Sequence, residues 1–385
     1  MIRIVPALTT ATADYVIYCA GCDAQGRVEV GMAGTRLRAV LAAVLVMALS
    51  AGCAQGAAPA APPRTVIDAT GAAVALPATV DRIADAWPAH TEVVRMLGAG
   101  DRIVATVLTR SAAPWLYEIQ PSLDRVPTVF TNSTVSTEEL LQTRPDVLFT
   151  DRGTQIAAKT DELGIPTVQL GFQNYPDLKQ MVSTTAEVLG GDAPARAVAY
   201  NDYLDRTLAQ VTGRTRDLPE QARPSVLHVY SLDPLVVDGT GSIIDEWITA
   251  AGGRNAAQVQ GNVTPVSTEQ VAAWNPDVVI LAKSAFVARD TGAQTVDKLR
   301  ADPFWSRLPA VAGDRVVVNP AGGWHWARYG VESALQLRWA ATVLHPDRFG
   351  DIDMVAETRS FYQQFLDHPL DDAQARRMLA AQDPE

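Results

Sequence analysis

Short β-branched runs that alternate with helical stretches are the feature that most constrains how this chain can fold. Each run is rich in Val, Ile, Leu and Thr, and the stretches between the runs have helical character, as at 91–97, 137–142 and 243–251. The strand-like runs lie at 102–107, 146–150, 167–170, 225–230, 277–281 and 315–319. This rhythm is typical of parallel βαβ units, in which a helix connects one strand to the next.

The segment between the two sets of runs has no strand signal. Its apolar residues recur roughly at helical spacing, at Ala195, Ala199, Tyr203, Leu208 and Val211. We therefore predict an α/β fold of two Rossmann-like lobes joined by a single long helix, with a ligand cleft between the lobes. The predicted boundaries are 65–191 for the first lobe, 192–222 for the helix and 223–385 for the second lobe.

The N-terminal region has the pattern of an export signal. A basic patch at 36–38 precedes an apolar run at 39–49, which is shorter than the roughly 20 residues that span a bilayer as a helix. The sequence Leu-Ser-Ala-Gly that ends at Cys53 resembles a bacterial lipobox, in which the thiol receives a diacylglyceryl group.

This pattern divides the N-terminal region into three parts. We expect a start extension at 1–31, a lipoprotein signal peptide at 32–52 and a flexible tether at 53–64 that is rich in Ala and Pro. Cys19 and Cys22 form a CxxC in the extension, but no second pair follows that would complete a zinc site.

Composition and motifs exclude two classes of function. The net charge is -11 and no basic stripe occurs, so we expect no nucleic-acid partner. The chain has no G-x-S-x-G elbow, Walker A loop, G-x-G-x-x-G after a strand or H-E-x-x-H. The tetrapeptide D-G-T-G at 238–241 resembles half of an aspartic protease site, but no second copy supplies the partner acid. We therefore predict a binding protein and not an enzyme.

Candidate ligand residues follow the predicted strands. Side chains at the carboxyl ends of parallel strands point into the crevice of an open α/β sheet. Aromatic rings and arginines gather there, which favours a large, partly apolar ligand with anionic groups. The candidates are Trp87, His90, Arg110, Trp115, Tyr117, Arg152, Tyr230, Asp238, Phe286, Trp324, His325, Arg328 and Tyr329.

Each candidate has a structural alternative. Trp87 and Trp324 could fill the core, and Arg152 or Arg328 could pair with nearby acids. His90 or His325 could coordinate a metal or cover an open position on a chelated one. The chain has five histidines, none at a closed zinc spacing, so we expect no structural metal site and no cofactor.

Four segments resemble a known family in order and spacing. They are TEVVRMLGAGDRIV at 91–104, LLQTRPD at 140–146, GSIIDEWITAAGGRN at 241–255 and VAAWNPD at 271–277. Together they resemble class III, cluster A solute-binding proteins, which serve ABC importers of ferric siderophores, haem and cobalamin. The resemblance covers roughly residues 64–380. It implies two lobes joined by a rigid helix, with only modest closure on binding.

The resemblance also implies partners and a ligand. We expect a monomeric lipoprotein, anchored through Cys53 on the extracytoplasmic face of the membrane, that delivers an iron chelate to an ABC permease and its ATPase. A ferric siderophore is the preferred ligand, while cobalamin, haem, molybdate or a metal ion remain alternatives. A crowded cleft of little volume would favour molybdate or a simple ion. A second alternative is an envelope lipoprotein of the same fold without a transport role.

One exposed glutamate on each lobe is implied as the contact with the permease. The matching positions are Glu92 and Glu246, each in the first turn of a predicted helix. A carboxylate there also complements the helix dipole, which is the structural alternative.

Overall fold

The computed structural model describes residues 4–6, 15–17, 64–131, 133–286, 290–328 and 330–385. The chain divides into two units, Met1–Ala61 and Pro62–Glu385. In the first unit β1 (Ile4–Pro6) pairs antiparallel with β2 (Tyr15–Ile17). The predicted signal peptide, the CxxC and Cys53 lie outside the described residues.

The first lobe of the second unit is built on a 4-stranded sheet in the order β6-β5-β7-β8. All of its strand pairs are parallel, as the βαβ rhythm predicts. The strands are β5 (Ile83–Asp85), β6 (Ile103–Thr106), β7 (Val147–Asp151) and β8 (Thr167–Leu170). Helices cover the sheet, so its strands are buried almost throughout.

The helices of this lobe begin and end at recognisable signals. They are α2 (His90–Met96), α3 (Pro114–Ile119), α4 (Thr137–Thr143), α5 (Gln155–Glu162) and α6 (Tyr175–Leu189). Asn174 caps α6, since its side chain accepts a hydrogen bond from the amide of Asp177 at 2.8 Å. A hairpin of β3 (Arg64–Ile67) and β4 (Ala73–Leu76) precedes the sheet.

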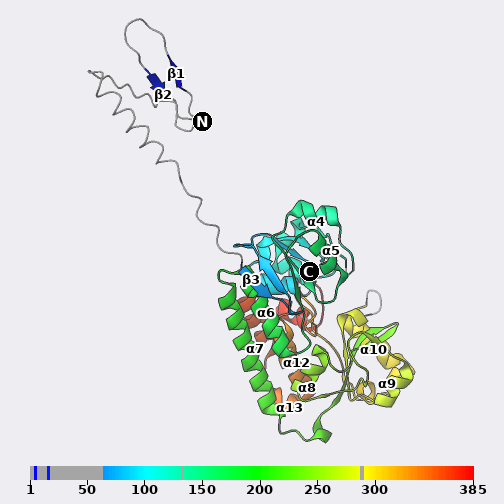
Figure 1. The fold of residues 1–385 in the computed structure, drawn as a ribbon. Coiled ribbons are helices and arrows are strands. Elements are labelled where there is room, and N and C mark those ends of the chain that lie inside the picture. The colour runs from blue at the N-terminus through cyan, green and yellow to red at the C-terminus, as the bar shows by residue number, and fades with distance from the viewer. Residues whose placement is uncertain (1–3, 7–14, 18–63, 132, 287–289, 329) are drawn as a thin grey trace. The chain divides into compact units, whose positions relative to one another are not determined.

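A single long helix, α7 (Ala193–Thr215), joins the lobes (Figure 1). Its 23 residues make it about 34 Å long. The buried residues of α7 lie three or four positions apart over most of its length, which gives one apolar stripe, and that stripe packs against α6 and α12. The long helix therefore lies along the side of the unit and ties both lobes together.

The second lobe contains a 6-stranded sheet with the path β12-β10-β9-β13-β14, and β11 pairs with β9. The strands are β9 (Ser225–Leu232), β10 (Leu235–Val237), β11 (Arg254–Asn255), β12 (Thr264–Pro265), β13 (Val278–Leu281) and β14 (Val316–Val318). The neighbours β11, β9, β13 and β14 run parallel, whereas β10 is antiparallel to both β9 and β12. The antiparallel edge is an addition that the βαβ rhythm does not predict.

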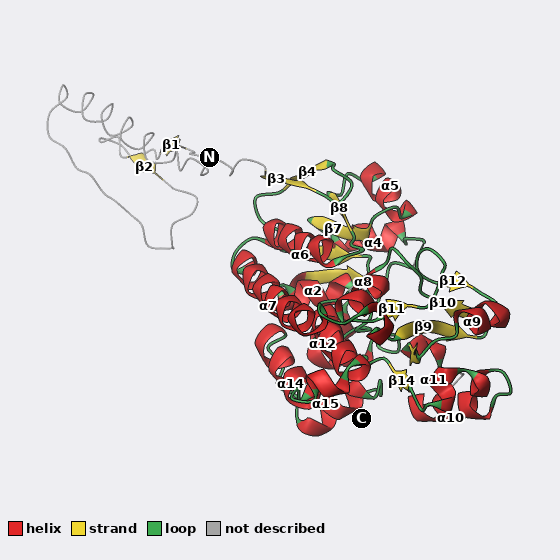
Figure 2. Ribbon diagram, turned by 90° about the horizontal axis from the view of Figure 1, so that it is seen from below, coloured by secondary structure: helices red, strands yellow, loops and turns green. Residues whose placement is uncertain are grey.

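Helices surround this sheet and return the chain to the first lobe (Figure 2). They are α8 (Ile243–Ala250), α9 (Thr268–Trp274), α10 (Gly292–Ala301), α11 (Pro309–Ala312), α12 (Ser333–Leu344), α13 (Pro346–Phe349), α14 (Met354–Phe365) and α15 (Asp372–Leu379). After α15, the carbonyl of Gln382 accepts a hydrogen bond from the Trp115 indole in the first lobe at 2.8 Å. No described helix is both long enough and apolar enough to cross a membrane.

One buried apolar cluster extends through both lobes. It includes Val93 on α2, Leu204 on α7, Trp247 on α8 and Leu337 on α12, all with 0% exposure. A shared core of this kind opposes separation of the lobes, because separation would expose it to water. The structure thus has the two-lobe architecture that the sequence predicts.

The two lobes share a repeated segment, a short helix followed by a turn that leads into a strand, which we call the strand entry. The helices α4 and α9 each begin at the Thr of a Ser-Thr-Glu sequence, and a left-handed residue follows each helix, Arg144 with φ 45° and Asn275 with φ 47°. Pro and Asp follow in both lobes before the next strand. Asp146 accepts hydrogen bonds from the amides of Asp81 and Arg82 at 2.8 Å. Asp277 accepts the equivalent bond from the amide of Ser225 at 2.7 Å.

Candidate functional site

The candidate site is a small pocket at the carboxyl ends of the parallel strands β9, β13 and β14. Ligands of open α/β sheets bind at this edge. The enclosed volume of the pocket is about 10 Å³, far below the roughly 300–1,000 Å³ of sites that hold drug-sized molecules. Its walls are Tyr230, Ala282, Lys283, Ser284, Asn319, Pro320, His325, Ala327 and Arg328.

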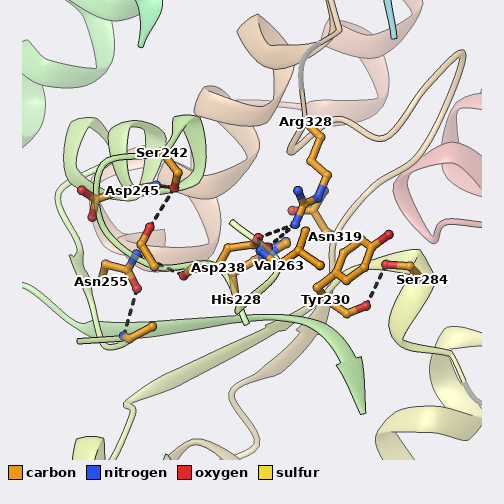
Figure 3. A network of polar contacts seen from close by, with 12 residues as sticks. His228, Tyr230, Asp238, Ser242, Asp245, Asn255, Val263, Ser284, Asn319 and Arg328 are labelled. Atoms are coloured by element: carbon orange, nitrogen blue, oxygen red, sulfur yellow. Dashed lines mark hydrogen bonds and ion pairs between the residues drawn. The ribbon is translucent and has the colours of Figure 1, made fainter. Parts of the chain in front are cut away.

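Arg328 is the most deeply placed cation of the pocket. Its guanidinium forms a buried ion pair with Asp238 and lies 4.5 Å from the centre of the Tyr230 ring (Figure 3). The side chain is 8% exposed, yet its Nε has no hydrogen-bond partner among the described residues. A buried donor without a partner is costly, so this nitrogen is suited to an acceptor from outside the protein.

Asp238 holds Arg328 in place. It follows β10, and the β9–β10 hairpin brings it next to His228, whose Nδ1 lies 2.7 Å from its carboxylate. The amide of Val263 donates to it at 3.0 Å. Burial alone would raise the pKa of Asp238, but the His228 hydrogen bond and the charges of His228 and Arg328 outweigh burial and lower the pKa to about 2. Asp238 therefore stays ionised at neutral pH.

His325 stands in the pocket as a neutral ring. Burial, followed by the charges of Lys283 and Arg328, lowers its pKa to about 4. Its ring makes an edge contact with Trp324, with centroids 5.0 Å apart. A neutral imidazole can donate one hydrogen bond to a ligand and can take up a proton if the ligand brings negative charge.

The hydroxyl and amide groups of the pocket have defined orientations. Ser284 Oγ donates to the carbonyl of Tyr230 at 2.7 Å, which leaves its oxygen able to accept. Asn319 and Gln336 exchange two amide hydrogen bonds at 3.1 and 2.8 Å, so Asn319 is fixed beneath the pocket. Two cations, a neutral histidine and several hydroxyls thus surround a narrow space.

Four predicted ligand residues meet at this place. Tyr230, His325 and Arg328 line the pocket, and Asp238 supports Arg328 from below. Trp324 stands behind His325 and is partly buried against the core. Tyr329 lies outside the described residues.

The aromatic candidates of the first lobe are buried and do not line the described pocket, so their contact with ligand stays a prediction. Trp87 is 7% exposed and stacks parallel to His90, with centroids 6.0 Å apart. Both nitrogens of His90 are engaged, Nδ1 by Asp85 at 3.2 Å and Nε2 by Thr185 at 2.9 Å. His90 is fully buried and so cannot coordinate a metal from the pocket.

Trp115 and Tyr117 are buried because they lie on a helix. Pro114 starts the helix α3, which turns both rings inward, where the segment was expected to be a loop. The Trp115 indole and the Tyr117 hydroxyl donate to backbone carbonyls at 2.8 and 2.9 Å. Arg110 is exposed and pairs with acids on the surface, at 2.8 Å to Glu118.

Two further candidates lie away from the described pocket. Arg152 is exposed at the end of β7 and lies against Gly171. Phe286 is partly buried beside Gly292 at the start of α10. A role of either residue in ligand binding stays a prediction.

Both glutamates expected at the permease contact face the other lobe instead. Glu92 is fully buried and accepts a hydrogen bond from the amide of Val331 at 3.2 Å. Glu246 is half-buried and accepts from the backbone of Tyr175 at the start of α6. The prediction that Glu92 is exposed is wrong, because the first turn of α2 points into the lobe interface and not to solvent.

Sequence reasoning missed Lys283 and Asn319. Lys283 is the second residue after the parallel strand β13, and Asn319 directly follows the parallel strand β14. The rule that selected Tyr230 from the end of its strand would therefore also have selected them.

The described residues contain no group of three or more His, Cys, Asp and Glu side chains that could hold a metal ion. Gly239 of the D-G-T-G turn packs against the carbonyl of Val259, where an added Cβ would lie 1.9 Å away.

Comparisons with known proteins agree with this architecture. A family model described as "Periplasmic binding protein" matches residues 83–321. The molybdate-binding protein MolA of Haemophilus influenzae is 26% identical over 278 residues, which cover 64% of this chain and 74% of MolA.

Two solved structures share the fold. A periplasmic solute binding protein of Veillonella parvula is 28% identical, with a TM-score of 0.69 over 82% of this chain and 96% of that one. The structure of Haemophilus influenzae MolA bound to molybdate superposes with a TM-score of 0.71 at 20% identity, over 80% of this chain and 99% of MolA.

Proposed function

Since this chain belongs to the periplasmic binding protein family, as the substrate-binding protein of an ABC transporter, we propose that its substrate is a small oxyanion of the molybdate type. The observation that carries the proposal is the buried guanidinium of Arg328, whose Nε has no partner among the described residues and which borders a narrow, cationic pocket. Arginine offers forked donors that match an oxyanion.

The other groups of the pocket suit the same ligand. Lys283 adds a second positive charge, and the Ser284 hydroxyl can turn to donate. The neutral His325 supplies a donor without the full cost of a buried charge. The similarity to MolA, whose structure contains molybdate, supports the choice among oxyanions.

The size of the pocket argues against the larger ligands. A ferric siderophore, haem or cobalamin needs an apolar cleft of several hundred Å³, whereas the enclosed volume of this pocket is about 10 Å³. The aromatic rings expected to form such a cleft, those of Trp87 and Trp115, are instead buried in the first lobe. We therefore propose an oxyanion in preference to the ferric siderophore that the sequence favoured.

The permease contact needs exposed carboxylates on both lobes. Glu138 and Glu269 hold equivalent positions in the repeated Ser-Thr-Glu entries of α4 and α9, and both are exposed. Both views place these helices on the side away from α7 (Figures 1 and 2). We propose that Glu138 and Glu269 take the docking role that the buried Glu92 cannot fill.

The same proposal places the mature chain on the extracytoplasmic face of the membrane, as a monomer with a lipid on Cys53. Its support is the lipobox-like sequence before Cys53. Replacement of Cys53 by Ala should release the protein from the membrane fraction, and retention of the variant there would contradict the anchor.

Calorimetric titration of the purified protein tests the ligand. We expect saturable binding of molybdate and tungstate with Kd of about 1 µM or tighter, weak binding of sulfate and phosphate, and no binding of haem, cobalamin or ferric catecholate and hydroxamate chelates. Tight binding of one ferric chelate, with no response to molybdate, would overturn the oxyanion proposal and restore the siderophore.

A further inference from the structure

Glu332 anchors the loop that carries His325 and Arg328. We call residues 322–328 and 330–331 the pocket loop. Glu332 is fully buried just before α12 and accepts hydrogen bonds from the amides of Gly323 and Trp324, both at 3.0 Å. It also accepts from the Trp326 indole at 2.9 Å and from the Tyr362 hydroxyl. Four donors thus converge on one carboxylate, which fixes the start of the loop.

Glu92 reaches the same loop from the first lobe. Both carboxyl groups lie against Gly323, whose amide donates to Glu332 and whose added Cβ would lie 2.4 Å from Oε1 of Glu92. Oε2 of Glu92 accepts from the amide of Val331 at 3.2 Å. Its Oε1 meets no donor among the described residues, so a bond between the two carboxyl groups requires a proton on one of them.

Glycines allow this close approach. A Cβ at Gly323 would lie 2.4 Å from Oε1 of Glu92, and a Cβ at Gly330 would lie 2.8 Å from its Oε2. A Cβ at Gly322 would lie 2.2 Å from Glu332. The glycines of the pocket loop are therefore explained by the carboxyl pair, and not by turn geometry alone.

Electrostatics disfavours two negative charges at this place. Burial raises the pKa of Glu92 well above its usual value, and the neighbouring Glu332 raises it further. Burial also raises the pKa of Glu332, to about 7. The other ionisable groups that face the pair are the phenols of Tyr200 on α7 and Tyr362 on α14, with Tyr175 of α6 next to Tyr200. All three phenols are neutral at neutral pH, because burial raises the pKa of each.

We propose that Glu92 and Glu332 are positioning residues that share one proton and thereby lock the pocket loop to α2 of the first lobe. Glu332 is the ionised partner, since four donors point at it, and Glu92 is the protonated partner that donates to it. Loss of the shared proton places two like charges side by side, separates α2 from the loop and loosens the groups that bind ligand. The consequence for affinity rests on the proposed function, whereas the lock itself does not.

Two isosteric variants separate this lock from a general packing role. In Glu92→Gln the amide can still donate to Glu332, but no titrating proton remains. In Glu332→Gln the amide oxygen can keep the donors that meet Oε1, but an NH₂ group then faces the amide of Trp324, so that bond is lost. Glu187→Gln, at an exposed site on α6, is the matched control.

Hydrogen exchange measured by mass spectrometry reads the loop without ligand. Relative to the Glu92→Gln protein at each pH, we expect exchange of the pocket-loop peptide in the unsubstituted protein to accelerate by up to about tenfold for each pH unit between the ordinary pKa of a glutamate, 4.5, and the raised pKa of the locked pair, and to level off above it. The Glu187→Gln protein should behave as the unsubstituted one. Glu332→Gln should exchange rapidly at every pH.

Molybdate titration adds the functional readout. Between pH 7 and 9 we expect the affinity of the unsubstituted protein to fall by about tenfold or more, and that of Glu92→Gln to change by less than about twofold. Equal pH responses of loop exchange in these two proteins would overturn the proposal, as would a Glu92→Gln loop that is as loose as that of Glu332→Gln.

The two proposals fail in different ways. If no oxyanion binds but loop exchange still shows the pH step that Glu92→Gln removes, the lock stands and the proposed ligand falls. If Glu332→Gln does not fold, the comparison of the unsubstituted protein with Glu92→Gln decides the proposal alone.

Discussion

Asp383, a few residues beyond α15, forms an ion pair with Lys283 in the wall of the pocket. Acidic side chains of the protein thus already pair with both pocket cations, Asp383 with Lys283 and Asp238 with Arg328. An entering oxyanion must compete with Asp383 for Lys283 or bind beside an ion pair that repels it.

Removal of this competitor should tighten binding. We expect Asp383→Asn to raise the affinity for molybdate by about two- to fivefold, because a partly exposed ion pair contributes up to about 1 kcal/mol. The gain should shrink at high salt. Asp372→Asn, which removes a surface ion pair with Arg359 at the start of α15, is the control for charge alone. Unchanged or weaker binding in Asp383→Asn would show that Asp383 does not oppose the ligand.

Arg328→Ala should cost both binding and stability. We expect affinity to fall by about 10- to 100-fold, since hydrogen bonds to charged groups contribute about 1.5 to 3 kcal/mol. The stability cost follows from the buried ion pair between Asp238 and the guanidinium. A buried carboxylate that loses its cationic partner should lower the free energy of unfolding by about 3 to 5 kcal/mol.

The double variant Arg328→Ala, Asp238→Asn separates these two effects. It should recover much of the lost stability in thermal unfolding while oxyanion binding stays weak. Recovery of binding as well would mean that Arg328 acts only through the fold.

His325 predicts uptake of protons on binding. Its pKa of about 4 in the free protein lies below its ordinary value of 6.5, so it is neutral at pH 7. Its contribution to stability is present above pH 6.5 and is lost as the pH falls towards 4. A bound anion raises this pKa, so affinity should rise as the pH falls from about 7 to 5.5. Titrations in buffers of different ionisation enthalpy measure the uptake, which His325→Asn should abolish.

Glu138 and Glu269 should affect uptake without affecting ligand binding. The double change to Gln removes exposed carboxylates from α4 and α9, which contribute no residue to the pocket walls. We expect transport of labelled molybdate by cells to fall severalfold, while the affinity of the purified variant stays the same. Glu118→Gln and Glu220→Gln, also at charged surface positions, provide the control. Normal transport by the double variant would exclude these helices as the docking surface.

The alternation of strands and helices was sufficient to predict the two-lobe fold, because burial of a parallel sheet demands that pattern. The strand ends of the second lobe also predicted Tyr230, His325 and Arg328. In the first lobe the same rule selected rings that do not line the described pocket, since Pro114 starts a helix that turns Trp115 inward. The sequence could not show that both ring nitrogens of His90 are engaged, because their partners Asp85 and Thr185 meet His90 only in the folded chain.

Lys283 and Glu92 show the other limit of sequence reasoning. A lone lysine after a strand has the pattern of a solvated charge, and nothing local indicates that Asp383 will meet it. A glutamate in the first turn of a helix is typical of an exposed cap. Only the return of the chain after β14 brings Glu332 next to Glu92, from far along the sequence.

The repeated strand entry constrains the shape of the partner. Residues 136–147 and 267–278 present the same Ser-Thr-Glu start and the same Pro-Asp-Val end on the two halves of the protein. A partner surface that contacts both segments would therefore bind nearly the same arrangement of side chains on each lobe. Two identical subunits related by a two-fold axis offer such a surface at no extra genetic cost. The repeat within one chain thus matches the symmetry of a dimer.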